Sequence, residues 1–257
     1  MNESAKLSVT IITLNEAENI GRCLKSIKGL SDEIVVVDSG SKDKTVEIVK
    51  KYDVKLFHRE FDNYANQKNY AADQTSGNWV FSIDADEVVT KKLRGEIKKA
   101  IIEPEFDAYS IPRCNIIFGK FIRFTRWQPE LDRHVWLWKK SHGRWRGNVH
   151  EEVKINGSVG RLKNPKIHYQ YETISQFWEM MNKYSELDAE KYTSGDVLSK
   201  LNFYALSLFL PIYHFFLRYI YRLGFLDGWR GFVLSYLMAI YQFNVIVKKY
   251  ENSEIIK

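Results

Sequence analysis

The chain has only two cysteines in 257 residues, Cys23 and Cys114, and they lie far apart in the sequence. Because no CxxC or other metal-knuckle spacing occurs, the sequence indicates neither a disulfide framework nor a zinc site. The first residues, Met1–Lys6, are polar and lead directly into a strand-like run, so no signal peptide is expected. These absences favour a reducing, cytoplasmic environment.

The composition also lacks the marks of a disordered or repetitive chain. Hydrophobic residues make up 45% and aromatic residues 14% of the sequence, and no internal repeat or low-complexity segment is visible. The net charge of +6 is unevenly placed, since Arg113–Gln170 holds thirteen Lys or Arg against four Asp or Glu. This local excess favours anionic partners, namely phosphates, nucleic acid or an acidic membrane surface. A solvated basic face is the simpler alternative.

The first hundred residues alternate between strand-like and helix-like segments. Strands are expected over 7–14, 33–38, 54–57 and 79–83. Helices are expected over 19–28, 44–51, 64–74 and 91–102. This alternation predicts an α/β domain with a doubly wound, mostly parallel sheet. Short aromatic-rich and Arg-rich runs over 108–170 predict a mixed-sheet half that completes the same domain.

A helix is expected over Thr173–Lys191, and two apolar runs follow it. Leu201–Leu217 and Phe232–Val247 each contain only three polar residues, but both fall short of the roughly 20 apolar residues that a spanning helix needs. Short aromatic-rich helices flanked by Arg and Lys are typical of an interfacial membrane anchor. The alternative is a pair of buried helices, in a dimer interface or in the domain's own core.

The strongest candidate site directly follows the apolar run Trp79–Ile83. Asp84 and Asp86 come next, and residues at i and i+2 lie on the same side of an extended chain. Carboxylates after a parallel strand lie in the crevice where open α/β sheets bind ligands. Hard oxygen ligands there suit Mg2+ or Mn2+, which fills its remaining positions with phosphates and water.

Polar residues also follow the first two strands. Thr13, Asn15 and Glu16 come after the first strand, and Asp38 ends the second. No Gly-rich phosphate loop follows the first strand, so a dinucleotide fold of the oxidoreductase kind is not indicated. The phosphates of a nucleotide are therefore expected to be held by a metal at the Asp-x-Asp.

The chain carries four motifs, in order, that resemble the family-2 glycosyltransferases of GT-A fold: SVTIITLNEAENIGRCLKSI, EIVVVDSGSKDKT, ANQKNYAADQTSGNWVFSIDADE and RWRGNVHEEV. The similarity covers residues 6–190, and the subgroup it most resembles is that of the lipopolysaccharide core β-glucosyltransferases. The resemblance implies a GT-A domain over 1–192, with a nucleotide-sugar-binding half (1–104) and an acceptor half (105–192). A helical section that associates with membrane or dimerises would follow over 193–257.

The resemblance also implies roles for the polar residues at the strand ends. The nucleoside would be cradled by Thr13, Asn15, Glu16 and Asp38, and Lys68 would lie near the donor phosphates or base. Four of the five have an ordinary structural alternative: turn capping for Thr13 and Asn15, an N-cap for Asp38, and a solvated side chain for Lys68.

Within the Asp-x-Asp, Asp84 would face the ribose or the metal, and Ala85 would belong to the donor site. Asp86 would bind the Mn2+ or Mg2+ that bridges the diphosphate. A divalent cation neutralises the negative charge that grows on the departing nucleoside diphosphate. The resemblance therefore implies a metal-dependent enzyme.

The attacking hydroxyl needs a general base, and RWRGNVHEEV supplies two carboxylates. Glu151 matches the family's pattern and is the predicted base; Glu152, its neighbour on a strand, would point to the opposite face. Asp132 is the next candidate, and His150 could assist or bind metal. The acceptor could be lined by tryptophans, although several of them must be core: Trp127, Trp136, Trp138 and Trp145.

The sequence and its resemblance thus predict an inverting enzyme, peripheral on the inner face of the cytoplasmic membrane, with a homodimer as an open alternative. It would move a sugar from a nucleotide-sugar donor, with UDP-hexose the first choice, to a glycolipid in β-linkage. An alternative enzyme would use a polyprenyl phosphate as acceptor. A non-enzymatic nucleic-acid-binding protein is the remaining alternative, but no helix-turn-helix or RNP pattern occurs, so no nucleic-acid partner is expected.

Overall fold

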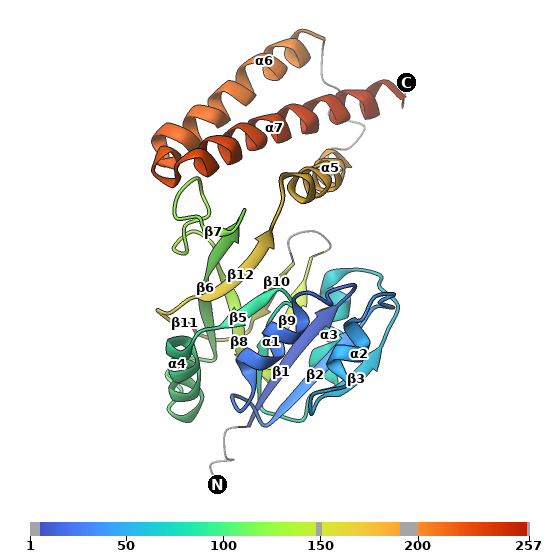
Figure 1. Ribbon diagram of the computed structural model, residues 1–257, viewed down its shortest axis with the longest axis vertical. Helices are drawn as coiled ribbons and strands as arrows, with labels where there is room; N and C mark the ends of the chain where they lie inside the picture. Colours follow the sequence, from blue (N-terminus) through green and yellow to red (C-terminus); the bar gives the residue numbers. More distant parts are fainter. Residues whose placement is uncertain (1–5, 148–150, 191–199, 256–257) are drawn as a thin grey trace. The chain divides into compact units, whose positions relative to one another are not determined.

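The computed structural model describes residues 6–147, 151–190 and 200–255, which form two compact units (Figure 1). The first unit takes the described residues up to Cys114 together with Pro129–Tyr169. The second takes Asn115–Gln128 and the described residues from Gln170 onward. The domain boundary expected after residue 192 falls in 191–199, outside the described residues, and stays a prediction.

The first unit is built on a sheet whose beginning is parallel. Four parallel strands lie in the order β3-β2-β1-β4: β1 Leu7–Thr13, β2 Glu33–Asp38, β3 Lys55–His58 and β4 Trp79–Ser82. The order continues as β8-β6-β12-β5: β5 Glu87–Val89, β6 Ala108–Ile117, β8 Arg133–Lys139 and β12 Lys166–Tyr171. Antiparallel pairing of β8 with β4 and of β12 with β5 makes this second half mixed, as predicted.

Shorter strands complete the pairing: β7 Lys120–Phe121 and β11 Val159–Arg161 pair with β6, and β9 Gly143–Arg146 forms a hairpin with β10 Glu152–Ile155. The helices of the first unit are α1 Ile20–Ile27, α2 Thr45–Val49, α3 Tyr64–Asp73, α4 Lys91–Ile102 and the 3-10 turn η1 Lys140–His142. Two of the expected helices, α3 and α4, begin at polar side chains that cap them. Asn63 accepts the N–H of Asn66 at the start of α3 (2.8 Å), and Thr90 accepts that of Leu93 at the start of α4 (3.2 Å).

The core of the first unit covers both faces of the parallel strands. All four side chains of β4 are buried, and so are six of the seven in β1. Burial on both faces is typical of parallel strands in α/β proteins. Because protein covers the faces, ligands must approach at the strand ends.

The second unit is helical. Its helices are α5 Ile174–Glu190, α6 Lys200–Phe216, the π-helical turn η2 Leu217–Tyr221, the 3-10 turn η3 Gly224–Asp227 and α7 Trp229–Ile255. The long helices α6 and α7 lie side by side as a hairpin, orange and red in Figure 1. Seven buried residues form the core of this unit: Ile117, Phe118, Ile122, Phe177, Met181, Leu234 and Leu237.

The hairpin helices are longer than the apolar runs suggested. Leu201–Tyr221 (21 residues) and Trp229–Ser253 (25 residues) are long and apolar enough to cross a membrane, by length and composition. The expectation that both are too short to span is therefore wrong. Only 6% of the apolar window in the first of these segments is buried, against 33% in the second.

Candidate active site

The Asp-x-Asp lies in a turn, at the carboxyl end of β4. The strand ends at Ser82, and the N–H of Glu87 donates to the carbonyl of Asp84 (3.0 Å). The expectation that Asp84 and Asp86 share one face of an extended chain is therefore wrong, because Asp84, Ala85 and Asp86 have left the strand. The turn gives the two carboxylates different partners.

Lys68, on α3, joins Asp84 to Glu151. Its Nζ lies 3.1 Å from Asp84 Oδ1 and 2.9 Å from Glu151 Oε1. The side chain is only 4% exposed, and the ammonium lies over the rings of Trp145 (4.5 Å) and Trp136 (5.1 Å). The alternative of a solvated lysine is therefore wrong. Lys68 connects a strand-end carboxylate with the predicted base.

Burial and charge act in opposite directions on the pKa values of this group. Burial lowers the pKa of Lys68, but the carboxylates of Asp84 and Glu151 outweigh it and raise the pKa to about 12. Burial would raise the pKa of Asp84, yet the charges of Lys68, Lys166 and Arg113 hold that pKa well below its usual range. At neutral pH Lys68 is therefore an ammonium and Asp84 a carboxylate.

Helix α3 also positions the β9–β10 hairpin, which contains Trp145. The Nδ2 of Asn69 donates to the carbonyl of Trp145 and its Oδ1 accepts the N–H of the same residue, both at 3.0 Å. Glu151 directly precedes β10 and is half-buried against Lys68, whereas Glu152 is exposed. Adjacent residues of one helix thus fasten the hairpin and the carboxylate beside it.

Asp86 offers an oxygen that fits a metal ion. Its Oδ2 lies 3.2 Å from His168 Nε2, while its Oδ1 is buried and has no hydrogen-bond partner among the described residues. Burial raises the pKa of Glu16 to about 7; a hydrogen bond from Asn19 opposes this rise, and the charge of Asp86 adds to it. A buried, unpaired carboxylate oxygen near other carboxylates suits a cation. No group of three or more metal-ligating side chains occurs in the described part of the chain, so phosphate oxygens would have to complete the ligand set.

The loops after β1 and β2 are held by their own hydrogen bonds. Thr13 Oγ1 is buried and has no partner within the described ranges. Asn15 has a left-handed backbone (φ 54°), and its Oδ1 accepts the N–H of Lys42 (2.8 Å), which matches turn capping. Asp38 accepts two N–H groups of its own turn, each at 2.9 Å. It is not a helix N-cap, because α2 begins at Thr45.

A second group of buried charges was not predicted. Lys166 and Glu87 form a fully buried ion pair, and Arg113 Nη1 lies 3.9 Å from Glu87 Oε1. Burial lowers the pKa of Lys166 to about 8. Asp132, the alternative base, is bound to Arg113 Nη2 at 2.7 Å. One signal could have revealed the group: Lys166 and His168 alternate along β12 and so lie on one face.

Comparison with known proteins identifies the chain. The model of Glycosyl transferase family 2 matches residues 8–186. The chain belongs to this family. Its fold is therefore the α/β GT-A fold predicted from the sequence, and it is a glycosyltransferase. The non-enzymatic nucleic-acid-binding alternative is wrong.

Relatives match over almost the whole length of this family 2 member. The chain is 31% identical over 255 residues to the lipopolysaccharide core biosynthesis glycosyltransferase LpsC of Rhizobium meliloti, covering 95% of this chain and 92% of that one. It is 30% identical over 266 residues to an uncharacterized glycosyltransferase of Rickettsia conorii, covering 98% and 93%. A structure of S. aureus TarS 1–349 in complex with UDP-GlcNAc is 17% identical, covers 98% of this chain and 91% of that one, and has a TM-score of 0.49.

The tryptophans predicted to line the acceptor site of this glycosyltransferase are mostly core residues. Trp136, Trp138 and Trp145 are buried, so their ring faces pack against protein. Trp127 belongs to the second unit and packs against its apolar core. His150 lies outside the described residues.

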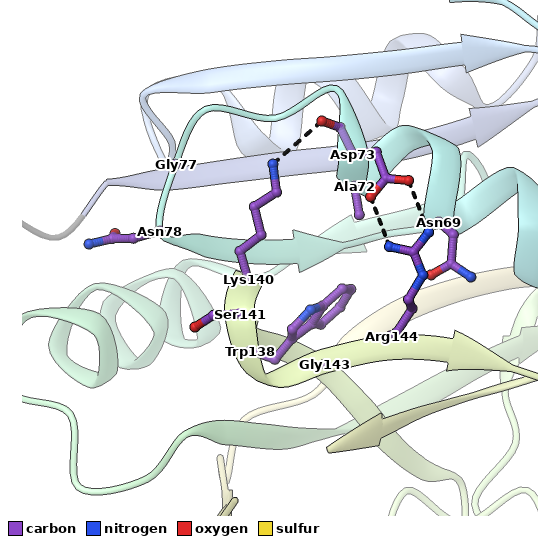
Figure 2. Close-up of a pocket in the computed structure, with 10 residues that line it drawn as sticks. All are labelled: Asn69, Ala72, Asp73, Gly77, Asn78, Trp138, Lys140, Ser141, Gly143 and Arg144. Atoms are coloured by element: carbon purple, nitrogen blue, oxygen red, sulfur yellow. Dashed lines mark hydrogen bonds and ion pairs between the residues drawn. The ribbon is translucent and has the colours of Figure 1, made fainter. Parts of the chain in front are cut away.

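A hollow of about 410 Å3 lies at the other end of β4 (Figure 2). Arg144 Nη1 pairs there with Asp73 (2.9 Å), and Lys140 Nζ donates to the carbonyl of Asp73 (3.4 Å). Open α/β sheets bind ligands at the carboxyl ends of their strands, so this hollow is separate from the candidate active site. Both cations come from the basic segment 113–170, which is therefore not wholly free for anionic partners.

Proposed function

We propose that this glycosyltransferase is metal-dependent and inverting, and that it moves a sugar from a nucleotide-sugar, with UDP-hexose the first choice, to a glycolipid. Similarity to the lipopolysaccharide core biosynthesis glycosyltransferase LpsC supports a glycolipid of the lipopolysaccharide core as the acceptor. One in-line displacement would invert the anomeric centre and give a β-linkage from an α-linked donor. The single observation that carries the proposal is the bridge of Lys68 between Asp84 and Glu151.

On the donor side, the loops after β1, β2 and β4 supply the groups. Thr13 has an unpartnered buried hydroxyl within the described residues, which suits a hydrogen bond to a nucleoside. The roles of Asn15, Glu16, Asp38 and Ala85 in binding the nucleoside follow from the same position at the strand ends. Lys68, an ammonium at neutral pH, would interact with the donor phosphates as well as orient Asp84.

Asp86, with Asp84 beside it, would hold Mn2+ or Mg2+ through the buried oxygen that has no partner in the described residues. When bound, such a cation stabilises the negative charge on the departing diphosphate. His168, on the other oxygen of Asp86, would keep that carboxylate in one orientation.

Glu151 would accept the proton of the attacking hydroxyl. The ammonium of Lys68 lies 2.9 Å from Oε1 of this carboxylate. The same contact fixes the carboxylate before the acceptor binds, which supports an oriented attack. Glu152 is exposed and has no such contact in the described structure.

The apolar hairpin would hold the enzyme on the inner face of the cytoplasmic membrane, where a lipid acceptor is reached. Many large apolar side chains of α6 and α7 are exposed, which supports burial in lipid or in a homodimer. Two helices of spanning length also favour a second candidate, transfer to a polyprenyl phosphate. Assays with the same donor and either acceptor would discriminate between the two.

Titration calorimetry of donor binding to the full-length protein tests the metal role. With Mn2+ present, Asp86→Ala should bind the donor at least about tenfold more weakly than wild type, while Asp53→Ala, an exposed carboxylate, should match wild type. EDTA should weaken wild type to the level of Asp86→Ala. Equal affinity of wild type with Mn2+ and with EDTA would refute metal dependence. Thermal stabilisation by UDP-, GDP- and dTDP-sugars identifies the nucleotide.

A further inference from the structure

Three arginines gather at the turn of the α6–α7 hairpin, within the second unit. Arg218 and Arg222 come from the turn itself, and Arg126 comes from the segment 115–128. The Nη1 of Arg218 donates to the carbonyl of Thr125 (2.7 Å), and the N–H of Thr125 donates to the carbonyl of Arg222 (3.2 Å). These contacts bring the three residues, called here the arginine cluster, to one place.

The arginine cluster has no carboxylate to balance it. The segments 115–128 and 217–231 together contain six Lys or Arg and a single acid, Asp227. Asp227 is buried, and its carboxylate accepts the backbone N–H groups of Arg123 (3.1 Å) and Phe124 (2.9 Å). None of the six cations forms an ion pair with a carboxylate in the part of the chain that the structure describes. Cations collected without counter-charges make an anion-binding site.

Arg218 is the fixed centre of the arginine cluster. Its residue is only 8% exposed, and its guanidinium lies over the ring of Trp127 (5.3 Å). Apart from the bond to Thr125, its N–H donors have no hydrogen-bond acceptor among the described residues. A guanidinium has five N–H donors in a planar fork that matches the oxygens of a phosphate. A buried arginine with most donors unused is therefore prepared for a phosphate or carboxylate.

The backbone around Arg218 is constrained. Leu217–Tyr221 forms a π-helical turn, which is uncommon and occurs frequently at functional sites. Gly224 follows, and a Cβ at Gly231 would lie 1.8 Å from the carbonyl oxygen of Gly224. This close approach fixes the turn against α7. The arginine cluster is thus held by packed backbone and not by a loose loop.

An apolar groove adjoins the arginine cluster, because the guanidinium of Arg222 lies over the ring of Tyr221 (5.5 Å), which lines the groove. It measures about 610 Å3 and is lined by Tyr213, Phe216, Leu217, Ile220 and Tyr221. Four of these five residues are at least half exposed, and Tyr221 and Tyr213 are the most exposed. A hydrocarbon chain would gain by covering this surface. A cationic surface and an apolar surface therefore lie next to each other. This arrangement matches a phospholipid, whose phosphate lies next to its acyl chains.

We propose that the arginine cluster and this groove bind an anionic membrane phospholipid, with the phosphate on the arginines and an acyl chain in the groove. The inference rests on the membrane association in the proposed function and names the lipid chemistry behind it. The lipid site uses residues of the second unit alone and none of those proposed for sugar transfer.

Flotation of the full-length protein with vesicles tests the proposal. Wild type should bind vesicles of phosphatidylglycerol and phosphatidylcholine at least about thirtyfold better than vesicles of phosphatidylcholine alone. Near an anionic surface one arginine changes partitioning by about fivefold, so Arg126→Gln/Arg222→Gln should lose about thirtyfold on the anionic vesicles and little on the neutral ones. Arg126→Lys/Arg222→Lys should keep most of the binding.

The matched control is Lys98→Gln/Lys99→Gln, which removes the same charge from two exposed lysines of α4. An equal loss in this control would overturn the site in favour of net charge. Equal binding of wild type to both kinds of vesicle would overturn the site alone, whereas no binding to either would also overturn the proposed membrane association. Displacement of the protein from the vesicles by inorganic phosphate, at constant ionic strength, would show that the phosphate alone is recognised and would overturn the groove as an acyl-chain site. Unchanged donor affinity of the arginine variant shows that it is folded.

Discussion

The two units of this glycosyltransferase differ in whether their buried cations are paired with carboxylates. In the first unit, Lys68 lies between the carboxylates of Asp84 and Glu151, and Lys166 pairs with Glu87. In the second unit, Arg218 is almost as buried as Lys68, but among the described residues its guanidinium contacts only a carbonyl and an aromatic ring.

This difference separates two uses of charge. A buried pair holds its members in one geometry, which a reaction site needs before the substrate arrives. An unbalanced cation leaves its attraction available to an anion from outside. Loss of one charge should therefore cost stability or activity in the first unit and almost nothing in the second. Three charge-removing substitutions and one change to the paired site's support, Asn69→Ala, test this contrast.

The largest loss of stability is expected from Lys166→Met. The substitution leaves Glu87 fully buried and removes its direct partner, while Arg113 at 3.9 Å and His168 remain near it. Breaking a buried pair by removing one partner costs about 3–5 kcal/mol. Urea unfolding measures this loss against Lys163→Met, which removes an exposed lysine. The double variant Glu87→Gln/Lys166→Met should regain part of it. Equal stability of the two lysine variants would show that the pair contributes nothing.

Glu151→Gln should have the next largest effect, on transfer and not on stability. It keeps the size of the side chain but removes its basicity, so the rate of transfer should fall by at least about a hundredfold while donor affinity stays near wild type. Glu152→Gln, on the exposed neighbour, should cost little. The reverse order would make Glu152 the base. If neither variant slows transfer, Asp132 is the next residue to replace.

Local pattern was sufficient to predict most of the fold. The expected strand 33–38 and helix 91–102 match β2 and α4 at both ends. Apolar runs of four to eight residues and helical spacing can both be recognised within a short stretch of sequence. The same holds for the strand ends, where Asp84 and Asp86 were found by their position alone.

What local pattern did not reveal are pairings across the chain. Lys68 meets Glu151 over a separation of 83 residues, and Lys166 meets Glu87 over 79. Nothing near Lys68 in the sequence distinguishes a buried lysine from a solvated one. Its ammonium is covered by Trp136 on β8 and Trp145 on β9, which are distant from it in the sequence. The turn at Asp84 was missed for a similar reason: the apolar run does not show where pairing with β1 stops.

Asn69→Ala tests how the paired site is held in place. The substitution removes both hydrogen bonds to Trp145, and leaving a buried backbone group unpaired costs about 1–3 kcal/mol. The rate of transfer should fall as well, because Glu151 directly precedes β10 in the β9–β10 hairpin that Asn69 holds. Asn66→Ala, which loses only a contact with exposed Asp62, is the control on the same helix. A slower rate without a loss of stability would point to a direct contact of Asn69 with substrate.

The smallest change in stability is expected from Arg126→Gln. The sign of that change shows whether the charges of the second unit are unpaired, in contrast to those of the first. Arg126 is exposed and forms no ion pair within the described residues, while the charges of Arg126 and Arg222 both repel that of Arg218. Removing one of three like charges relieves repulsion, so stability should stay within about 0.5 kcal/mol of wild type or rise. Arg126→Lys keeps the charge and should show no gain, and high salt should erase the difference between the two variants. A loss as large as that of Asn69→Ala would mean that Arg126 has a partner within the protein, and the arginine cluster would then be another paired site.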